Sequence, residues 1–195
     1  MIIWLNGTFG VGKTTTAGEL TARLPGARLF DAEKVGEMLG HVLGRPERDF
    51  QDWQPWRGLV VETARQLLDF VGGTLVVTQT VLREGYWQEL SGGLAEAGIP
   101  VHHFVLHTDD GTLVHRITTD TKPDSRNAGQ WRLDHLPAYR DALPWLRREA
   151  ETIDTTGIPP SRVAEIIIDH LPRTGPNGPS GTTAAAQTAS GRIPR

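Results

Sequence analysis

The first residues that could carry chemistry lie at the amino terminus, directly after the apolar run Ile2 to Leu5. They are Gly7, Thr8, Phe9, Gly10, Val11, Gly12, Lys13, Thr14 and Thr15. Glycines let a backbone curl so that successive N–H groups point inward at phosphate oxygens. A lysine at this spacing reaches the β- and γ-phosphates of a nucleotide, and the hydroxyl after it binds Mg²⁺. The pattern therefore predicts a phosphate-binding P-loop.

The context of this loop is the one that the motif requires, a strand before it and a helix after it. Ala17, Leu20 and Leu24 share one helical face, and the amino end of such a helix adds partial positive charge. We expect residues 7–15 to bind ATP, with Lys13 in a catalytic role and Thr14 as the Mg²⁺ ligand. The chain lacks the Asn-Lys-x-Asp pattern of guanine-specific proteins, which favours ATP over GTP.

A carboxylate follows the second predicted strand, 27–30. Asp31 at this position could accept a proton from a substrate hydroxyl that attacks the γ-phosphate, so we expect it to be catalytic and to touch the acceptor. Aspartate is also a common helix N-cap, which is the structural alternative. Glu33 is the weaker candidate, because it would sit in the first turn of the next helix.

The third predicted strand, 74–78, is followed by Gln79 rather than by a carboxylate. P-loop proteins that hydrolyse nucleotides normally hold Mg²⁺ through an aspartate there. Either Asp31 supplies that charge, or Gln79 orients water or substrate. The missing carboxylate speaks against a motor-type ATPase and less against a small-molecule kinase.

Arginines after the predicted strands could neutralise charge on a transferring phosphoryl group, although each could also be a solvated surface residue. We expect Arg116 to be catalytic and to bind nucleotide together with Arg126. We expect Arg57 and Arg83 to contact the acceptor. Arg132 lies near the same polar stretch as Arg126.

Tryptophans and histidines complete the inventory. Trp53 and Trp131 stand in polar surroundings and could stack on an acceptor, and we assign Trp53 to the acceptor site. Other aromatic residues more often belong to the core; here these are Trp56, Tyr86 and Trp87. Adjacent residues on a strand face opposite ways, so His102 and His103 do not predict a metal site.

The strands and helices that must position these residues alternate along the chain, which predicts an α/β fold with a parallel five-stranded sheet between helices. The expected strands are 2–5, 27–30, 74–78, 101–106 and 152–154. The expected helices begin at Lys13, lie within 33–43, and then span 56–71, 86–97, 109–119, 133–148 (kinked or broken at Pro137 and Pro144) and 160–171. Ligands bind at the carboxyl ends of such strands. We expect one P-loop domain over 1–171, with a mobile lid at about 119–132, and a disordered tail over 172–195, where Gly, Pro, Ser and Thr dominate.

Bulk composition excludes several classes of protein. The 195 residues are 38% hydrophobic and 22% charged, with a net charge of −3, so no basic field favours nucleic acid. Cysteine is absent, which excludes disulfides and fits a reducing cytoplasm. The loop begins too early to follow a signal peptide, and no apolar run is long enough to span a bilayer. We expect a cytoplasmic monomer or homodimer without stable membrane attachment.

The chain resembles the tunicamycin-resistance protein family of P-loop ATP-binding proteins. The likeness is strongest from Met1 to Thr14 and continues at Asp49-Phe50-Gln51, at Trp56-Arg57 and at 101–106. More distantly the chain is similar to nucleoside monophosphate kinases and to chloramphenicol phosphotransferase, in which an aspartate at the place of Asp31 acts as base. The resemblance implies ATP binding and resistance to a nucleoside-type antibiotic. Whereas the best-known member attaches to membranes through an amphipathic segment near its carboxyl end, residues after Leu171 carry no apolar stripe.

Two hypotheses follow. In the first, the chain transfers a phosphoryl group from ATP to a hydroxyl of a small molecule such as tunicamycin. In the second, it binds the drug in an ATP-dependent manner without modifying it. The composition disfavours a third class, nucleic-acid-dependent ATPases.

Overall fold

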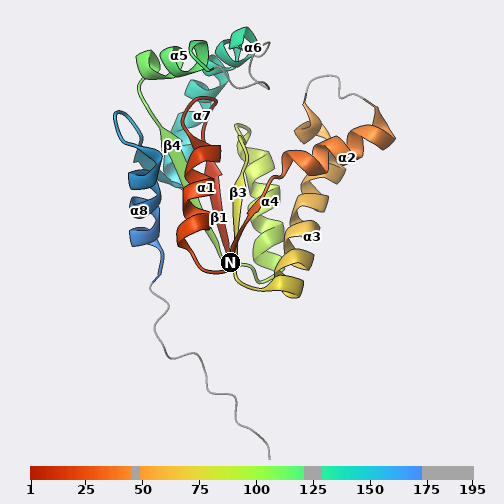
Figure 1. Ribbon diagram of the computed structural model, residues 1–195. Coiled ribbons are helices and arrows are strands. Elements are labelled where there is room, and N and C mark those ends of the chain that lie inside the picture. The colour runs from red at the N-terminus through yellow and green to blue at the C-terminus, as the bar shows by residue number, and fades with distance from the viewer. Residues whose placement is uncertain (45–48, 121–128, 173–195) are drawn as a thin grey trace, which may run out of the picture.

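Five parallel strands form the centre of the computed structural model, which describes residues 1–44, 49–120 and 129–172 (Figure 1). They are β1 (Ile2–Asn6), β2 (Ala27–Phe30), β3 (Thr74–Thr78), β4 (Val101–His107) and β5 (Glu151–Asp154). Their order in the sheet is β2-β3-β1-β4-β5, and every neighbouring pair is parallel. The predicted α/β fold with a five-stranded parallel sheet is confirmed.

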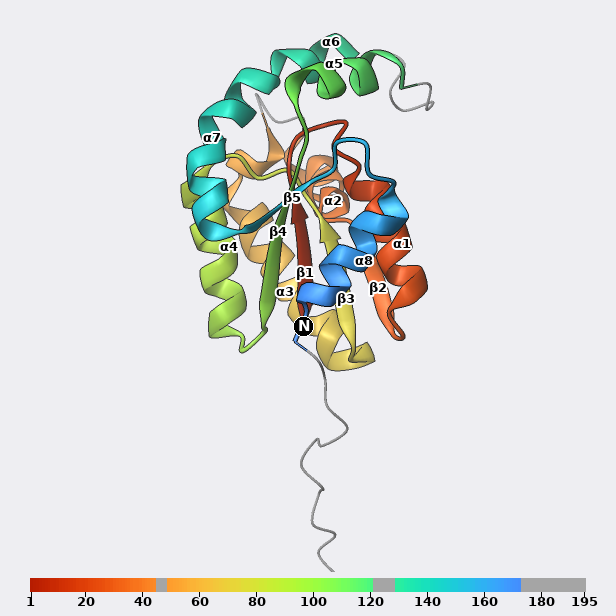
Figure 2. The ribbon, with the colours of Figure 1, turned by 90° about the vertical axis from the view of Figure 1, so that its left-hand side faces the viewer.

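Helices cover both faces of this sheet, as Figure 2 shows. They are α1 (Lys13–Arg23), α2 (Glu33–Leu43), α3 (Gln54–Val71), α4 (Glu84–Glu96), α5 (Asp110–Thr118), α6 (Gly129–Asp134), α7 (Leu136–Glu149) and α8 (Pro160–His170), with a short 3-10 turn at Phe50–Asp52. Helices α1 and α8 pack together on one face, and α3 and α4 pack together on the other (Figures 1 and 2). Helices α5 and α6 lie over the carboxyl ends of the strands and cover the edge of the sheet from which the P-loop extends (Figures 1 and 2).

The core is built around β1, which runs through the middle of the sheet. Ile2, Ile3, Trp4 and Leu5 are all fully buried, as expected for a strand covered on both faces. The Trp4 ring meets the Trp87 ring of α4 edge-on, with centroids 5.2 Å apart. This rigid packing fixes the point at which the chain leaves the sheet and enters the P-loop.

Several predicted boundaries differ from the structure. The stretch 133–148, expected to be helical with a kink or break at Pro137 and Pro144, contains a break at His135, two residues before Pro137, and α7 continues through Pro144 without ending there. Pro137 lies in the first turn of α7, where the missing N–H of proline is tolerated. In the expected lid, 121–128 lie outside the described residues, as does Arg126, whereas Gly129–Asp134 forms α6. The predicted tail, apart from Pro172, also lies outside them.

The chain enters β3 through Gly72 and Gly73, which both have positive φ angles, +65° and +76°. A Cβ atom on Gly73 would lie 2.7 Å from the carbonyl oxygen of Gly26, in the turn before β2. At Gly72 nothing lies within 4 Å of the corresponding position. Of these two glycines, only Gly73 therefore combines a positive φ with a close approach between two turns.

We expect Gly73→Ala to lower the free energy of unfolding by clearly more than Gly72→Ala, whose cost of about 1–3 kcal/mol would come from the backbone conformation alone (φ +65°, ψ −165°). Urea unfolding of both variants measures the difference. Equal losses would show that the contact with Gly26 adds nothing.

Candidate functional site

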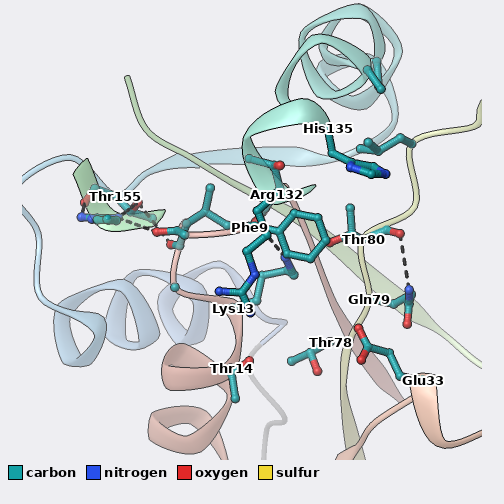
Figure 3. Close-up of a pocket in the computed structure, with 18 of the residues that line it drawn as sticks. Phe9, Lys13, Thr14, Glu33, Thr78, Gln79, Thr80, Arg132, His135 and Thr155 are labelled. Carbon is teal, nitrogen blue, oxygen red and sulfur yellow. Dashed lines mark hydrogen bonds between the residues drawn. The ribbon is translucent and has the colours of Figure 1, made fainter. Parts of the chain in front are cut away.

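A cavity of about 1380 Å³ opens at the carboxyl ends of the strands. The P-loop forms one wall, and the connections after β2, β3 and β5 form others. Figure 3 shows side chains from these segments facing one another across it. This is the edge of the sheet at which we expected the ligand.

The P-loop backbone adopts the curl that its glycines predict. Gly7, Gly10 and Gly12 have φ angles of +124°, +80° and +95°. A Cβ atom on Gly7 would lie 2.4 Å from the carbonyl oxygen of Leu106, at the end of β4. Only glycine fits there, so the loop begins against the neighbouring strand.

The side chain of Asn6 ties this loop to the end of β3. Its Oδ1 accepts hydrogen bonds from the N–H groups of Gly7 (2.8 Å) and Val81 (3.0 Å), and its Nδ2 donates to the carbonyl of Val81 (2.9 Å). The Thr80 hydroxyl donates to the Gly7 carbonyl at 2.8 Å. Sequence reasoning did not single out Asn6 or Thr80; the polar residue that ends the otherwise apolar β1 was the signal available for Asn6.

The side chain of Lys13 folds back over the P-loop. Its Nζ donates to the carbonyls of Gly7 and Thr8, both at 2.8 Å, and lies 5.7 Å from the centre of the Phe9 ring. Burial lowers the pKa of the Lys13 ammonium to about 7, and nearby Glu33 opposes this effect. A polyphosphate beside Nζ would favour the charged form.

Two buried threonine hydroxyls of the loop and of α1 have no hydrogen-bond partner among the described residues, Thr8 Oγ1 and Thr16 Oγ1. The Thr14 side chain is exposed to the cavity. The loop therefore offers a curled backbone, a lysine and hydroxyl groups, a donor set that fits a nucleotide phosphate with Mg²⁺.

Arg116 fastens the far side of the loop. Its Nη1 donates to the Gly10 carbonyl (3.3 Å) and to Thr155 Oγ1 (3.2 Å), and its Nη2 donates to the Thr155 carbonyl (2.9 Å). Arg116 lines the cavity as predicted, and it also joins the loop to the segment between β5 and α8.

Of the two carboxylates after β2, Glu33 lines the cavity and Asp31 does not. Asp31 Oδ1 instead accepts the backbone N–H of Glu33 at 3.0 Å, at the start of α2. Figure 3 shows Glu33 reaching into the cavity beside Thr78. Partial burial and the charge of Asp31 raise the pKa of the Glu33 carboxyl. The geometry thus favours the residue that sequence reasoning ranked second.

Gln79 occupies the position after β3 where a carboxylate is usual. Its side chain lines the cavity, the residue is 3% exposed, and its Oε1 has no partner among the described residues. Its Nε2 makes one long hydrogen bond to the Thr80 carbonyl, at 3.4 Å. Gln79 thus presents an unpaired amide oxygen at the cavity, and its contact with a ligand stays a prediction.

The segment Asp49–Asp52 forms the opposite wall, and Arg57 supports it from behind. Arg57 is 7% exposed, does not line the cavity, and donates to the Gln51 carbonyl and to the Glu89 carboxylate. Gln51 in turn donates from Nε2 to the Thr80 carbonyl at 3.0 Å. The structure gives no support to direct acceptor contact by Arg57; the residue holds the wall that faces the cavity.

Of the remaining residues that we predicted to contact the acceptor, one lines the cavity and one does not. Arg83 lines the cavity and pairs with Asp52 (2.8 Å) and with the Tyr86 hydroxyl (2.6 Å). Trp53 does not line it, whereas Trp131 does, packed edge-on against Phe9 at 5.0 Å. Tyr86, predicted to be core, lines it as well.

The histidines form no metal site in the described part of the chain, where no group of three His, Cys, Asp or Glu side chains could hold an ion. His103 stacks on Trp87, with ring centres 3.8 Å apart.

In the part of the chain that the structure describes, none of the helices combines the length and the apolar composition that crossing a membrane requires.

The fold and the loop together define a P-loop domain of the nucleotide kinase type, and comparison with known proteins agrees. The AAA_33 family, described as an AAA domain, matches residues 2–141. The tunicamycin resistance protein of Deinococcus radiodurans is 31% identical, with a TM-score of 0.64 over 86% of this chain and 93% of that one. The chain therefore belongs to the AAA_33 family and to the tunicamycin-resistance protein family, as the resemblance predicted.

More distant solved structures share the fold. A sugar kinase from Janibacter sp. HTCC2649 is 19% identical, with a TM-score of 0.63 over 86% of this chain and 92% of that one. The APS kinase CysC of Mycobacterium tuberculosis, solved with AMPPNP and APS, is 15% identical, with a TM-score of 0.56 over 86% and 95%. No curated protein sequence matches the chain.

The role given to Arg57 leads to a stability test. We expect Arg57→Ala to lower the free energy of unfolding by about 1.5–3 kcal/mol, because two charge-assisted hydrogen bonds of a buried side chain are lost. Arg65→Ala on the same helix is the matched control: Arg65 pairs with Glu62 and Asp69 at the surface and should cost less than about 1 kcal/mol. Urea unfolding measures both, and similar costs would contradict the supporting role.

Proposed function

We propose that the chain transfers the γ-phosphoryl group of ATP to a hydroxyl group of a small molecule, a nucleoside-type antibiotic such as tunicamycin. The observation that carries the proposal is a single cavity that contains both the P-loop and the carboxylate of Glu33. Its volume of about 1380 Å³ exceeds the 300–1,000 Å³ or so typical of a single-ligand pocket. There is room for a nucleotide and a second molecule.

The choice of an antibiotic rests on the likeness to the Deinococcus radiodurans protein, which is named for tunicamycin resistance. The match covers 86% of this chain and 93% of that protein. The kinases of similar fold support phosphoryl transfer as the type of reaction and say nothing about its acceptor.

In this proposal residues 7–15 hold the phosphates of ATP, and the exposed Thr14 hydroxyl binds Mg²⁺, which neutralises charge on the phosphates. Lys13 turns from the carbonyls of Gly7 and Thr8 toward the β- and γ-phosphates. Arg116 keeps the loop in position through Gly10 and Thr155.

Glu33 acts as the general base. The acceptor hydroxyl gives its proton to Glu33 while its oxygen bonds to the γ-phosphorus, and the bond from that phosphorus to the bridging oxygen breaks and releases ADP. The raised pKa of the Glu33 carboxyl makes its carboxylate a stronger base than that of an ordinary glutamate. Asp31 positions Glu33 through the backbone N–H that it accepts.

One observation favours the second candidate function, sequestration of the drug without modification. The connection after β3 is Thr78-Gln79-Thr80 and offers no carboxylate to a metal-bound water. A protein built to bind and not to react would tolerate this arrangement.

The two functions are separated by mass spectrometry of tunicamycin incubated with protein and Mg·ATP. We expect the drug to gain one phosphate. Glu33→Gln should lower the initial rate by about 10²–10⁴-fold, the range for loss of a general base. Asp31→Asn should have a smaller effect, because its role is indirect.

Each alternative outcome has a definite meaning. A larger loss with Asp31→Asn than with Glu33→Gln would return the base to Asp31, the sequence-based expectation. Tight binding of the drug with no gain of mass would establish sequestration. If neither ATP nor the drug binds, the proposed function fails.

The lowered pKa of Lys13 predicts that ATP binding takes up a proton. At pH 8 most ligand-free protein holds Lys13 neutral, since its pKa is about 7, and the bound phosphates make the charged form favourable. We therefore expect uptake approaching one proton for each ATP bound. Isothermal titration calorimetry in two buffers of different ionisation enthalpy measures this number.

Lys13→Arg is the matched control, because arginine stays charged in both states. Uptake should vanish in this variant. If the variant takes up as many protons as the parent, another group is responsible and the assignment to Lys13 is wrong.

A further inference from the structure

The cavity has two ends of different charge. At the P-loop end, Lys13 and Arg116 contribute positive charge, and Arg132 is paired with Asp120, which also lines the cavity, at 3.0 Å. At the other end, enclosed by Glu33, the segment 49–52, the start of α4 and one side of α7, the balance is reversed. We call this the acceptor end, and its ionisable side chains are Glu33, Asp49, Asp52, Glu84, Asp141, Arg83, Tyr86 and His135.

The arginines near the acceptor end are already engaged by carboxylates. Arg83 pairs with Asp52 at 2.8 Å, and Arg57 pairs with Glu89 at 2.6 Å. Arg148, which approaches from the end of α7, pairs with Glu84. An anionic acceptor would have to displace one of these carboxylates in order to gain an arginine contact.

Three carboxylates at this end have no cationic partner within hydrogen-bonding distance among the described residues: Glu33, Asp49 and Asp141. Within the described residues, the Asp49 side chain accepts hydrogen bonds from Gln51, through the backbone N–H at 2.9 Å and the side-chain amide at 3.3 Å. Partial burial and the nearby Asp52 raise the pKa of Asp49. Unpaired carboxylates in a cleft create a negative potential that repels anions and attracts cations.

A separate observation indicates that this end binds a ligand with polar hydrogens. The buried Gln79 lines the cavity, and its Oε1 accepts no hydrogen bond from any described residue. Ionised carboxylates are likewise acceptors only. The groups gathered here call for a partner that donates, such as hydroxyl or ammonium groups.

We propose that the acceptor end selects by charge: it takes hydroxyl-rich molecules, prefers those that carry a protonated amine, and rejects those that carry phosphate or carboxylate. This inference rests on the proposed function, because it concerns the acceptor of that reaction. It separates the chain from kinases whose acceptor is a nucleoside monophosphate, although the P-loop half is shared with them.

The test uses two series of probes, each built on one sugar or nucleoside and differing in one substituent, which is an amine, a hydroxyl or a phosphate. The first is glucosamine, glucose and glucose 6-phosphate; the second is 5′-amino-5′-deoxyuridine, uridine and uridine 5′-monophosphate. Calorimetry with the P-loop filled by Mg·AMPPNP measures binding at the acceptor end. We expect affinity to fall from amine to neutral to phosphate in each series, by about tenfold or more between the first and the last.

Asp49→Asn supplies the mechanistic check, since it keeps the shape of the side chain and removes its charge. The amine-to-phosphate affinity ratio should shrink by about threefold or more, and higher salt should shrink it in the parent as well. Asp169→Asn on α8 is the control, because it changes net charge by the same amount at a residue that does not line the cavity.

Failure of this inference is distinguishable from failure of the proposed function. Phosphorylation of tunicamycin together with equal or tighter binding of the phosphate-bearing probes would overturn the charge selection and leave the kinase intact. Selective binding without any phosphoryl transfer would uphold the charge selection and remove the kinase. If no probe of either series binds, or if Asp169→Asn changes the ratio as much as Asp49→Asn, the inference is wrong.

Discussion

The carbonyl of Gly7 is the group on which the site depends, because it joins three parts of the molecule. Gly7 is the first residue after the buried strand β1. Its carbonyl oxygen accepts hydrogen bonds from both Lys13 Nζ and the Thr80 hydroxyl at 2.8 Å. A lysine that turns toward phosphate must leave this carbonyl. Thr80 then remains as its donor, so the loop keeps its anchor on the β3 side while its cation engages the ligand. The N–H of the same residue is held by Asn6, so both polar groups of this peptide position have partners.

The hydrogen bond between Thr80 and Gly7 also links the two ends of the cavity. Thr80 bonds the P-loop with its hydroxyl and accepts Gln51 Nε2 with its carbonyl, and Arg57 holds the carbonyl of Gln51. A continuous set of hydrogen bonds thus runs from α3 through the wall of the acceptor end to the loop. Because these hydrogen bonds are partly buried and follow one another, a displacement of the wall would shift the carbonyl group of Gly7. The wall of the acceptor end and the P-loop are therefore joined by hydrogen bonds between described residues.

How much of this could be predicted depends on whether a feature is local in sequence. The P-loop, the five strands and the roles of their carboxyl ends follow from local patterns: two fixed glycines with Lys13 and Thr14, and apolar runs such as Ile2 to Leu5. Arg57 could not be predicted in the same way. Its neighbours in sequence suggested an exposed acceptor contact, but its partner Glu89 lies on another helix and turns it into a buried support. The same holds for Asn6, whose partner Val81 is 75 positions away.

The choice between Asp31 and Glu33 shows a limit of another kind. Both follow β2, and sequence position alone favours the first, because it ends the strand. In the structure α2 begins at Glu33 with Ala32 as its N-cap residue, the Asp31 side chain accepts the N–H of Glu33, and the Glu33 side chain lines the cavity. A glutamate has one more methylene than an aspartate, which lets it reach across toward Thr78 and Gln79. The connection after β3 thus brings Gln79 to the cavity, and the connection after β2 brings a carboxylate, that of Glu33, to the same cavity.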